Sequence, residues 1–313
     1  MGRGCEGEWM MEKEFTQIEW GSRVEDDCRQ IVRLAVREDL DRSYDWTSVA
    51  LAGGDATGRA AVVARSDGVV AGVRAGAVVL DEMEIEASWE PRVEDGEAIE
   101  AGQELVVFGG RIRDMLAAER LLLNLIGRLS GIASQTARYV AAIRGTDARL
   151  YDTRKTTPGW RRLEKYAVRC GGGNNHRTGL FDAVLIKDNH LALTGLTPAE
   201  AVRRARDFLA ELEWSGARPE MIVEVEVDTL GQLDEVLSAG PDIVLLDNMN
   251  PDQLRQAVAL RDASQTGVQL EASGGIAWET LRAIAETGVE RISVGALTHS
   301  AMSLDVGLDW KSS

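Results

Sequence analysis

Residues 221–249, MIVEVEVDTLGQLDEVLSAGPDIVLLDNM, contain two apolar runs of strand length with a helical or loop segment between them. The runs are MIVEVEV (221–227) and DIVLLD (242–247), and the intervening segment is LGQLDEVLSAG (230–240). Apolar runs with little polar alternation suit strands that are buried on both faces of a sheet. A strand, a helix and a second strand in succession predict parallel strands with the helix packed outside the sheet.

The same alternation extends outward in both directions. Further runs of strand length are RLYDT (149–153), AVLIKD (183–188), VQLEAS (268–273) and RISVG (291–295). The segments that separate these runs include TPAEAVRRARDFLAEL (197–212), PDQLRQAVALRDA (251–263) and WETLRAIAETG (278–288). Pro198 after Thr197 is typical of a helix start, and Gly240 and Gly288 are typical of helix ends. The pattern predicts a parallel sheet surrounded by helices.

The part of the chain before residue 130 has shorter and more mixed units. Residues 24–38 and 114–129 have the apolar spacing of helices. Strand-like pieces lie between them, and they are GRAAVVARS (58–66), GVVAGV (68–73) and GQELVVFGG (102–110). We predict an α+β module here, and its strand order stays open.

Composition excludes several classes of protein. The 313 residues can hold one large domain or two smaller ones, and the formal net charge of −16 argues against a nucleic-acid partner. No apolar run approaches the ~18 residues that cross a bilayer, and the amino terminus, MGRGCEGEWMMEKEF, has acids where a secretion signal would have an apolar core. Cys5, Cys28 and Cys170 have no metal-like spacing and fit a reducing compartment. We therefore expect a cytoplasmic protein with no membrane partner.

Residues 151–190 concentrate positive charge in this acidic chain. Among their cations are Arg154, Lys155, Arg161, Arg162, Arg169, His176, Arg177 and Lys187. A local group of cations in an acidic protein indicates a small anionic partner that is bound in a focused site. The alternative is a solvated basic face. We favour the binding site because the same block contains GGGNN (171–175), whose glycines allow a ligand to approach the backbone closely.

Polar residues or glycines follow the predicted strands at the point where each strand ends. These residues are Arg154, Lys155, Lys187, Asp188, Glu224, Glu226, Asp247, Asn248, Ser273, Gly274, Gly275 and Gly295. In β/α barrels, side chains at the carboxyl ends of the strands line the active site. One such residue could instead cap the next helix, but the repetition at successive strand ends favours a shared site.

Two glycine-rich turns, ASGGI (272–276) and SVGALTHSA (293–301), follow the last two predicted strands, where barrels often bind phosphate. His299 could donate to a phosphate oxygen or be a partly buried helix-start residue. Glu226 and Asp247 could hold Mg²⁺, bond ribose hydroxyls or stabilise a developing sugar cation, and Glu224 lies on the same strand face as Glu226. Together these features suggest that a phosphorylated sugar reacts with an acidic small molecule.

These residues lie within longer motifs, which are AERLLLNLIGRLSGIAS (118–134), DTRKTTPGWRRLEKYAVRCGGGNNHR (152–177), LIKDNH (185–190), LLDNM (245–249), LEASGGI (270–276) and ISVGALTHSA (292–301). In this order they resemble the quinolinate phosphoribosyltransferases, also called nicotinate-nucleotide pyrophosphorylases (carboxylating), of the type II phosphoribosyltransferase family. The resemblance spans residues 24–309.

The resemblance implies an α/β fold with two domains: an N-terminal α/β sandwich over residues 22–130 and an open α/β barrel, related to the TIM barrel, over residues 131–296. Residues 297–313 are expected to be able to pack back on the sandwich, and residues 1–21, which have no counterpart, to form a flexible tail. It also implies a homodimer with shared active sites, in which the N-terminal domain of one subunit covers the barrel mouth of the other. Assembly beyond the dimer is left open.

The implied reaction joins quinolinate and phosphoribosyl pyrophosphate to give nicotinate mononucleotide, pyrophosphate and CO₂ with Mg²⁺ as cofactor, a step of de novo NAD biosynthesis. The implied catalytic residues are Lys155, Lys187, Glu226 and Asp247, and the two carboxylates also serve Mg²⁺, directly or through water or substrate. The implied substrate-binding residues are Arg120, which reaches across the dimer interface, and Arg154, His176, Arg177, Ser273, Gly274, Gly275, Gly295 and His299. Asn175 stands where the family more often has an apolar residue, and we expect it to tilt the NNHR loop slightly.

Three other functions fit parts of the same pattern. One is a paralogue of this fold that accompanies molybdate transport genes, and a second is a phosphoribosyltransferase for another pyridine acid. The number of cations favours a dicarboxylate instead. The third is a catalytically silent phosphate- or nucleotide-binding regulator, which would have lost Lys187, Glu226 or Asp247, whereas this chain has all three.

Overall fold

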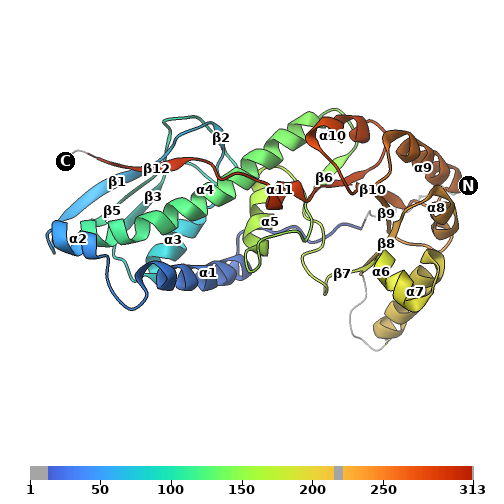
Figure 1. The fold of residues 1–313 in the computed structure, drawn as a ribbon, viewed down its shortest axis with the longest axis horizontal. Helices are drawn as coiled ribbons and strands as arrows, with labels where there is room; N and C mark the ends of the chain where they lie inside the picture. Colours follow the sequence, from blue (N-terminus) through green and yellow to red (C-terminus); the bar gives the residue numbers. More distant parts are fainter. Residues whose placement is uncertain (1–12, 215–220, 312–313) are drawn as a thin grey trace, which may run out of the picture.

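The computed structural model describes residues 13–214 and 221–311. Two domains lie side by side, and the 31-residue helix α4 (Ile112–Ala142) runs from one into the other (Figure 1). We expected a domain boundary near residue 130, and the buried stripe of α4 runs across that position, from Leu129 before it to Ile132 and Ala133 after it. One helix therefore belongs to both cores, and it fixes the N-terminal domain relative to the barrel.

The N-terminal domain is built on an antiparallel sheet with strand order β12-β1-β5-β3. Its elements are α1 (Ser22–Leu40), α2 (Trp46–Leu51), β1 (Thr57–Ala64), β2 (Gly68–Val69), α3 (Val73–Glu82), β3 (Ser88–Pro91), β4 (Ala98–Ile99) and β5 (Glu104–Arg111). The last strand, β12 (Val306–Trp310), comes from the far end of the chain and pairs with β1 from Ala60↔Trp310 to Ala64↔Val306. The chain therefore returns to its first domain after completing the second.

One face of this sheet is covered by helices. Val62 and Phe108, which point to that face, share a core with Val24 of α1, Val79 of α3 and Met115 of α4. Close packing within the domain depends on Gly76, because a Cβ there would lie 2.0 Å from the ring of Trp89. The predicted strand at 68–73 is shorter than expected, since α3 begins at Val73, whose N–H donates to the Asp95 carboxylate.

The second domain contains a six-stranded parallel sheet in the order β6-β11-β10-β9-β8-β7. Its elements are β6 (Arg149–Tyr151), α5 (Arg161–Cys170), β7 (Ala183–Ile186), α6 (Asp188–Thr194), α7 (Pro198–Trp214), β8 (Ile222–Val227), α8 (Leu230–Leu237), β9 (Ile243–Asp247), α9 (Pro251–Ser264), β10 (Gln269–Ser273), α10 (Trp278–Ala285), β11 (Arg291–Ser293) and α11 (Ala296–His299). In the described chain the edge strands β6 and β7 do not pair with each other, so the sheet curls without closing (Figure 1). The predicted α/β class, with a parallel sheet flanked by helices and a separate N-terminal domain, is confirmed.

We expected a flexible tail over residues 1–21, and this expectation is corrected for residues 13–21, which the structure describes. Residues 1–12 lie outside the described chain. Beyond them, Phe15 is only 4% exposed and packs with Ala183, Ile222 and Ile243 at the starts of three barrel strands. An apolar ring buried in this way holds its segment in place, so residues 13–21 form part of the barrel domain.

Among the helices of residues 13–214 and 221–311, none is both long enough and apolar enough to cross a bilayer. Cys28 and Cys170 are both free, and burial raises the pKa of each thiol to about 12. A thiol with a raised pKa is a poor nucleophile at neutral pH, so we assign Cys170 a packing role.

Candidate active site

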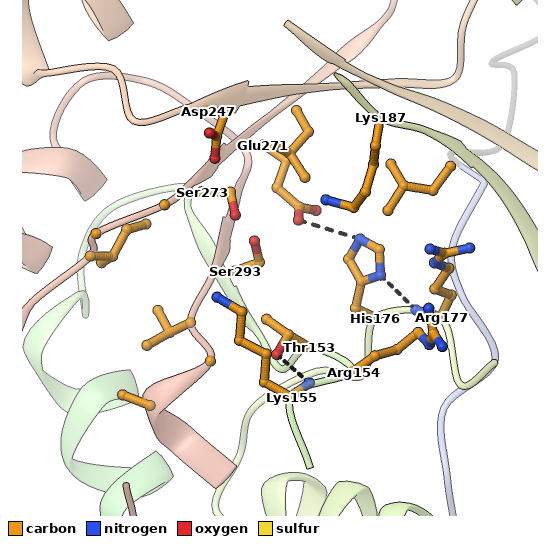
Figure 2. A pocket seen from close by; sticks show the side chains of 18 of the residues that line it. Thr153, Arg154, Lys155, His176, Arg177, Lys187, Asp247, Glu271, Ser273 and Ser293 are labelled. Atoms are coloured by element: carbon orange, nitrogen blue, oxygen red, sulfur yellow. Dashed lines mark hydrogen bonds and ion pairs between the residues drawn. The ribbon is translucent and has the colours of Figure 1, made fainter. Parts of the chain in front are cut away.

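A cavity of about 580 Å³ lies at the carboxyl ends of the parallel strands (Figure 2). It brings together most of the site residues that the sequence predicted, namely Arg154, Lys155, His176, Arg177, Lys187, Asp247, Ser273, Gly274, Gly275, Gly295 and His299. Parallel strands direct the residues after their carboxyl ends to one edge of the sheet. Residues that lie up to 145 positions apart in the chain (154 to 299) therefore meet in one cavity.

Two predicted residues do not line the cavity. Glu226 at the end of β8 gives its carboxylate to Lys187, whose Nζ lies 2.5 Å from Oε2. Arg120 on α4 lines a separate hollow together with Arg128 and Trp160. Glu226 therefore meets the cavity through Lys187, whereas Arg120 is not brought to the cavity of its own chain.

One wall of the cavity carries unpaired positive charge. Arg154 and Arg177 lie side by side on this wall, next to His176 (Figure 2). Burial and the neighbouring Arg154 lower the pKa of the Arg177 guanidinium. Within residues 13–214 and 221–311, neither arginine forms an ion pair with a carboxylate, and neither does Lys155. Arg177 is only 6% exposed, and buried cations are ordinarily paired, so this wall is suited to an anionic ligand.

His176 is held in one orientation by contacts on both of its nitrogens. Its Nδ1 accepts the backbone N–H of Arg177 at 2.8 Å, and its Nε2 lies 3.0 Å from Glu224 and 3.4 Å from Glu271. Burial disfavours the charged ring, but these carboxylates outweigh it and raise the pKa of His176 to about 10. The geometry places a proton on Nε2, and a second proton on Nδ1 would meet the Arg177 N–H, so the full imidazolium needs a small movement of that loop.

His176, Glu224 and Glu271 are also a buried group whose spacing could hold a metal ion. However, the side chain of Arg291 donates from Nε to Glu271 at 2.9 Å, and His176 Nε2 lies within ion-pair distance of both carboxylates. The raised pKa of His176 favours its imidazolium form, which together with Arg291 offsets the two carboxylates. We assign it no metal, and Glu224, which the sequence suggested as a site carboxylate, instead supports His176.

The opposite wall is formed by the two glycine-rich turns (Figure 2). Gly274 has φ +82°, and a Cβ there would lie 2.4 Å from Oδ1 of Asn248, so only glycine fits. Gly295 leaves room for the aliphatic stem of Lys155, because a Cβ would lie 2.9 Å from Lys155 Cδ. The Lys155 ammonium therefore lies over the turns, on the side of the cavity where phosphate is expected.

Asp247 is the carboxylate of the predicted set that lines this cavity. Partial burial raises its pKa, whereas Lys187 and the amide of Asn248, which donates to Oδ2 at 2.6 Å, oppose the rise. Asp247 is thus a localised negative charge between the cationic wall and the glycine turns.

The NNHR loop is held by a buried ion pair that sequence reasoning did not identify. Lys165 pairs with Asp152 and also donates to the His176 carbonyl at 2.9 Å, while Asp152 accepts the His176 N–H at 2.9 Å. Asn175 is fully buried and donates to Asp152 at 2.7 Å and to the Lys165 carbonyl at 2.9 Å. Asn175 therefore anchors the loop, and its amide explains why a polar residue occupies this position.

A second support, also missed, connects the loop after β6 with α11. Arg128 on α4 donates to Glu164 at 2.7 Å and to the Thr298 carbonyl at 2.6 Å. Glu164 in turn accepts the Thr157 N–H at 3.1 Å, and Thr298 donates to the Lys155 carbonyl at 2.7 Å. Opposite charges at 128 and 164, 36 residues apart, carry no local sequence signal, so only the folded chain brings them together.

Comparison with known proteins gives consistent matches over almost the whole chain. Residues 45–130 match the model of the quinolinate phosphoribosyl transferase N-terminal domain, and residues 132–309 match that of the C-terminal domain. The chain is 45% identical to a nicotinate-nucleotide pyrophosphorylase [carboxylating] of Mycobacterium leprae over 286 residues, which is 91% of this chain and 97% of that protein. A probable nicotinate-nucleotide pyrophosphorylase [carboxylating] of Bacillus subtilis is 41% identical over 82% of this chain and 84% of its own length.

A solved structure shows the same overall arrangement. The nicotinate-nucleotide pyrophosphorylase from Francisella tularensis superposes with a TM-score of 0.84 at 34% identity, covering 95% of this chain and 100% of that one. The cavity described above thus lies in a fold shared with these proteins.

Proposed function

The chain belongs to the quinolinate phosphoribosyltransferase family, and we propose how its cavity divides the two substrates of a phosphoribosyltransferase of NAD biosynthesis. Quinolinate, a pyridine dicarboxylate, binds the cationic wall, and phosphoribosyl pyrophosphate binds the glycine turns. The observation that carries the proposal is the unpaired charge of Arg154, Lys155 and Arg177 in a chain whose net charge is −16.

The carboxylates of quinolinate require donors with a defined geometry. Guanidinium groups bind carboxylates through two parallel N–H donors, so Arg154 and Arg177 suit this task better than lysines would. The orientation of His176 is fixed by Glu224 and Glu271, so the ring offers a rigid surface next to these arginines. Bound in this way, the pyridine nitrogen faces the centre of the cavity.

The transfer step forms one bond and breaks another at the sugar. The pyridine nitrogen donates its electron pair to the anomeric carbon of the ribose, and the bond from that carbon to oxygen breaks, so pyrophosphate leaves with the electron pair. Positive charge develops on the sugar, and Asp247 supplies a nearby negative charge to stabilise it. Lys155, over the glycine turns, offsets the negative charge that builds up on the leaving group.

Decarboxylation follows on the ring that has become cationic. The bond between the ring carbon and its carboxylate breaks to release CO₂, and the electron pair stays on that carbon, next to the positive nitrogen. The carbon then takes up a proton. No side chain is required to remove a proton in this step.

We also propose Mg²⁺ as cofactor, because carboxylate and phosphate oxygens are its preferred ligands. Asp247 has no cation within ion-pair distance in the described chain, whereas Glu226 is engaged by Lys187 at 2.5 Å. Asp247 with substrate oxygens therefore fits the ion better than a direct pair of carboxylates, and Glu226 would contribute through water or after Lys187 moves. When bound, Mg²⁺ supplies charge neutralisation for the pyrophosphate.

We further propose that the enzyme acts in the cytoplasm as a homodimer with shared sites. Arg120 lines a hollow away from its own cavity, so its proposed role with quinolinate requires a second subunit. Large apolar side chains at the tip of the N-terminal domain support this, since Tyr44, Trp46 and Leu51 are 69%, 67% and 82% exposed.

The proposed function is tested by assaying the purified protein with phosphoribosyl pyrophosphate and Mg²⁺ and either quinolinate or nicotinate. We expect nicotinate mononucleotide from quinolinate and little from nicotinate, because the monoacid leaves buried cations unpaired. Comparable turnover of the two acids, measured by chromatography of the product, would contradict the proposal.

A further inference from the structure

Residues 13–18 close the amino-terminal end of the barrel, opposite the active-site cavity. The segment leads from α1 into the interior of the second domain (dark blue in Figure 1). Phe15 packs there with Ala183, Ile222 and Ile243, and Lys13 pairs with Asp242 at 3.3 Å. We call this segment the floor plug.

The floor plug touches the active site directly through one ring. The centroids of Phe15 and His176 lie 4.3 Å apart, with an angle of 33° between the ring planes. His176 lines the cavity from above, and Phe15 supports it from below. Loss of the phenyl ring would leave space beneath His176, and a side chain beside a void is less well fixed.

A line of buried charges also runs from the floor plug to His176. Glu14 accepts from the Tyr151 hydroxyl at 2.6 Å and from Arg291 Nη1 at 3.1 Å. Arg291 is fully buried and donates from Nε to Glu271 at 2.9 Å, and the other oxygen of Glu271 lies 3.4 Å from His176 Nε2. Glu14 and Glu271 therefore share the charge of Arg291, and Glu271 is one of the carboxylates that orient His176.

A third set of contacts fixes the residue next to His176. The Asn175 N–H donates to the Gln17 side chain at 2.8 Å, and the Ile18 N–H donates to the Asn175 side chain at 2.7 Å. The floor plug thus reaches His176 by a ring contact, by a line of charges and by hydrogen bonds to the neighbouring Asn175. A buried line of ion pairs is a weak source of stability compared with apolar packing, so closing the barrel does not by itself account for it.

We propose that the floor plug positions His176 for the pyridine dicarboxylate, so that Glu14 and Phe15 determine quinolinate affinity without touching the substrate. They are positioning residues. The inference rests on the proposed function, because it takes the cationic wall beside His176 as the quinolinate site. It assigns a role to a segment of the chain that precedes both matched domains.

The first test compares the two substrates in Glu14→Gln and Phe15→Leu enzymes. We expect the KM for quinolinate to rise about tenfold, since small misplacement of a binding group is costly, while the KM for phosphoribosyl pyrophosphate stays within about twofold. Glu14→Asp, which keeps the charge, should lie closer to wild type. Lys13→Gln is the matched control, because Lys13 belongs to the same segment and forms an ion pair that does not lead to His176.

The second test measures the NMR signals of the His176 nitrogens in the absence of substrate. The chain has 3 histidines, so ¹⁵N-histidine labelling gives few signals, and a His176→Gln sample identifies those of His176. We expect the His176 nitrogen shifts to move in Glu14→Gln and Phe15→Leu and to stay unchanged in Lys13→Gln.

The outcomes separate the two proposals. If the wild-type enzyme does not use quinolinate, the proposed function fails. If it does, but the two variants leave the quinolinate KM or the His176 signals unchanged, or raise both KM values equally, the positioning role is wrong while the proposed function stands.

Discussion

At the amino-terminal end of the barrel, the buried Arg291 forms ion pairs with Glu14 and Glu271 and a hydrogen bond with the Tyr151 hydroxyl. At the carboxyl-terminal end, Arg154 and Arg177 lie in the cavity with no carboxylate partner in the described chain. The same residue type thus occurs at both ends of the barrel. Pairing, more than the presence of cations, therefore distinguishes a structural charge from one that binds a ligand.

The largest expected effect comes from a change at the paired end. Arg291→Met removes the cation and leaves Glu271 buried beside Glu224 with less compensation, so we expect a loss of about 3–5 kcal/mol in the free energy of unfolding. Urea unfolding measures it. Arg59→Met is the matched control, because Arg59 pairs with Glu90 at 2.9 Å on the surface, where such pairs contribute about 0–1 kcal/mol. If Arg291→Met and Arg59→Met lowered the free energy of unfolding equally, the expected difference between a buried and a surface ion pair would be wrong.

Removing an unpaired cation from the cavity should affect ligand binding and leave the stability of the fold almost unchanged. Arg154→Ala should leave urea unfolding almost unchanged and weaken quinolinate binding by about 1.5–3 kcal/mol, or ten- to a hundredfold. Binding of phosphoribosyl pyrophosphate should stay largely intact. Calorimetric titration with each substrate measures both, with Arg65→Ala, an arginine paired to Asp309 outside the cavity, as control. A large loss of stability would mean that Arg154 is structural.

A change at Asp247, which lines the cavity, tests whether quinolinate and phosphoribosyl pyrophosphate bind in different parts of it. Asp247→Asn should lower kcat about tenfold, because its charge matters most when the sugar becomes cationic. Quinolinate affinity in the absence of the sugar should be nearly unchanged. Pre-steady-state turnover and calorimetry test this pair of statements, and abolished quinolinate binding would show that the division of the cavity between the two substrates is wrong.

The smallest expected signal concerns Arg120, which lines a hollow away from both ends of its own barrel. If Arg120 completes the site of a partner, mixing Arg120→Ala and Lys187→Ala chains gives hybrid dimers with one intact site. Random mixing should then restore about one quarter of wild-type activity, whereas each variant alone has little. Stable hybrids that recover no activity would count against shared sites.

Sequence patterns were sufficient to predict the parallel sheet and the residues of the cavity wall. Strand-length apolar runs fold into parallel strands, and polar residues placed just after them must share one edge of the sheet. Arg154, Lys187, Asp247 and Ser273 could therefore be assigned to one site from their positions in the chain. The long motifs also indicated the family to which the chain belongs. These are local or repeated signals, and each can be read over a few residues.

Which charges pair depends on the tertiary structure. Glu271 and Arg291 are register partners on β10 and β11, and Glu14 reaches Arg291 from a segment that was expected to be a tail. Glu226 is engaged by Lys187 because β7 and β8 are neighbours. Pairing energies fall steeply with distance and depend on burial, and neither quantity is defined until the strands have taken their order in the sheet. For this reason the cations at the two ends of the barrel look alike in the sequence and differ in the fold.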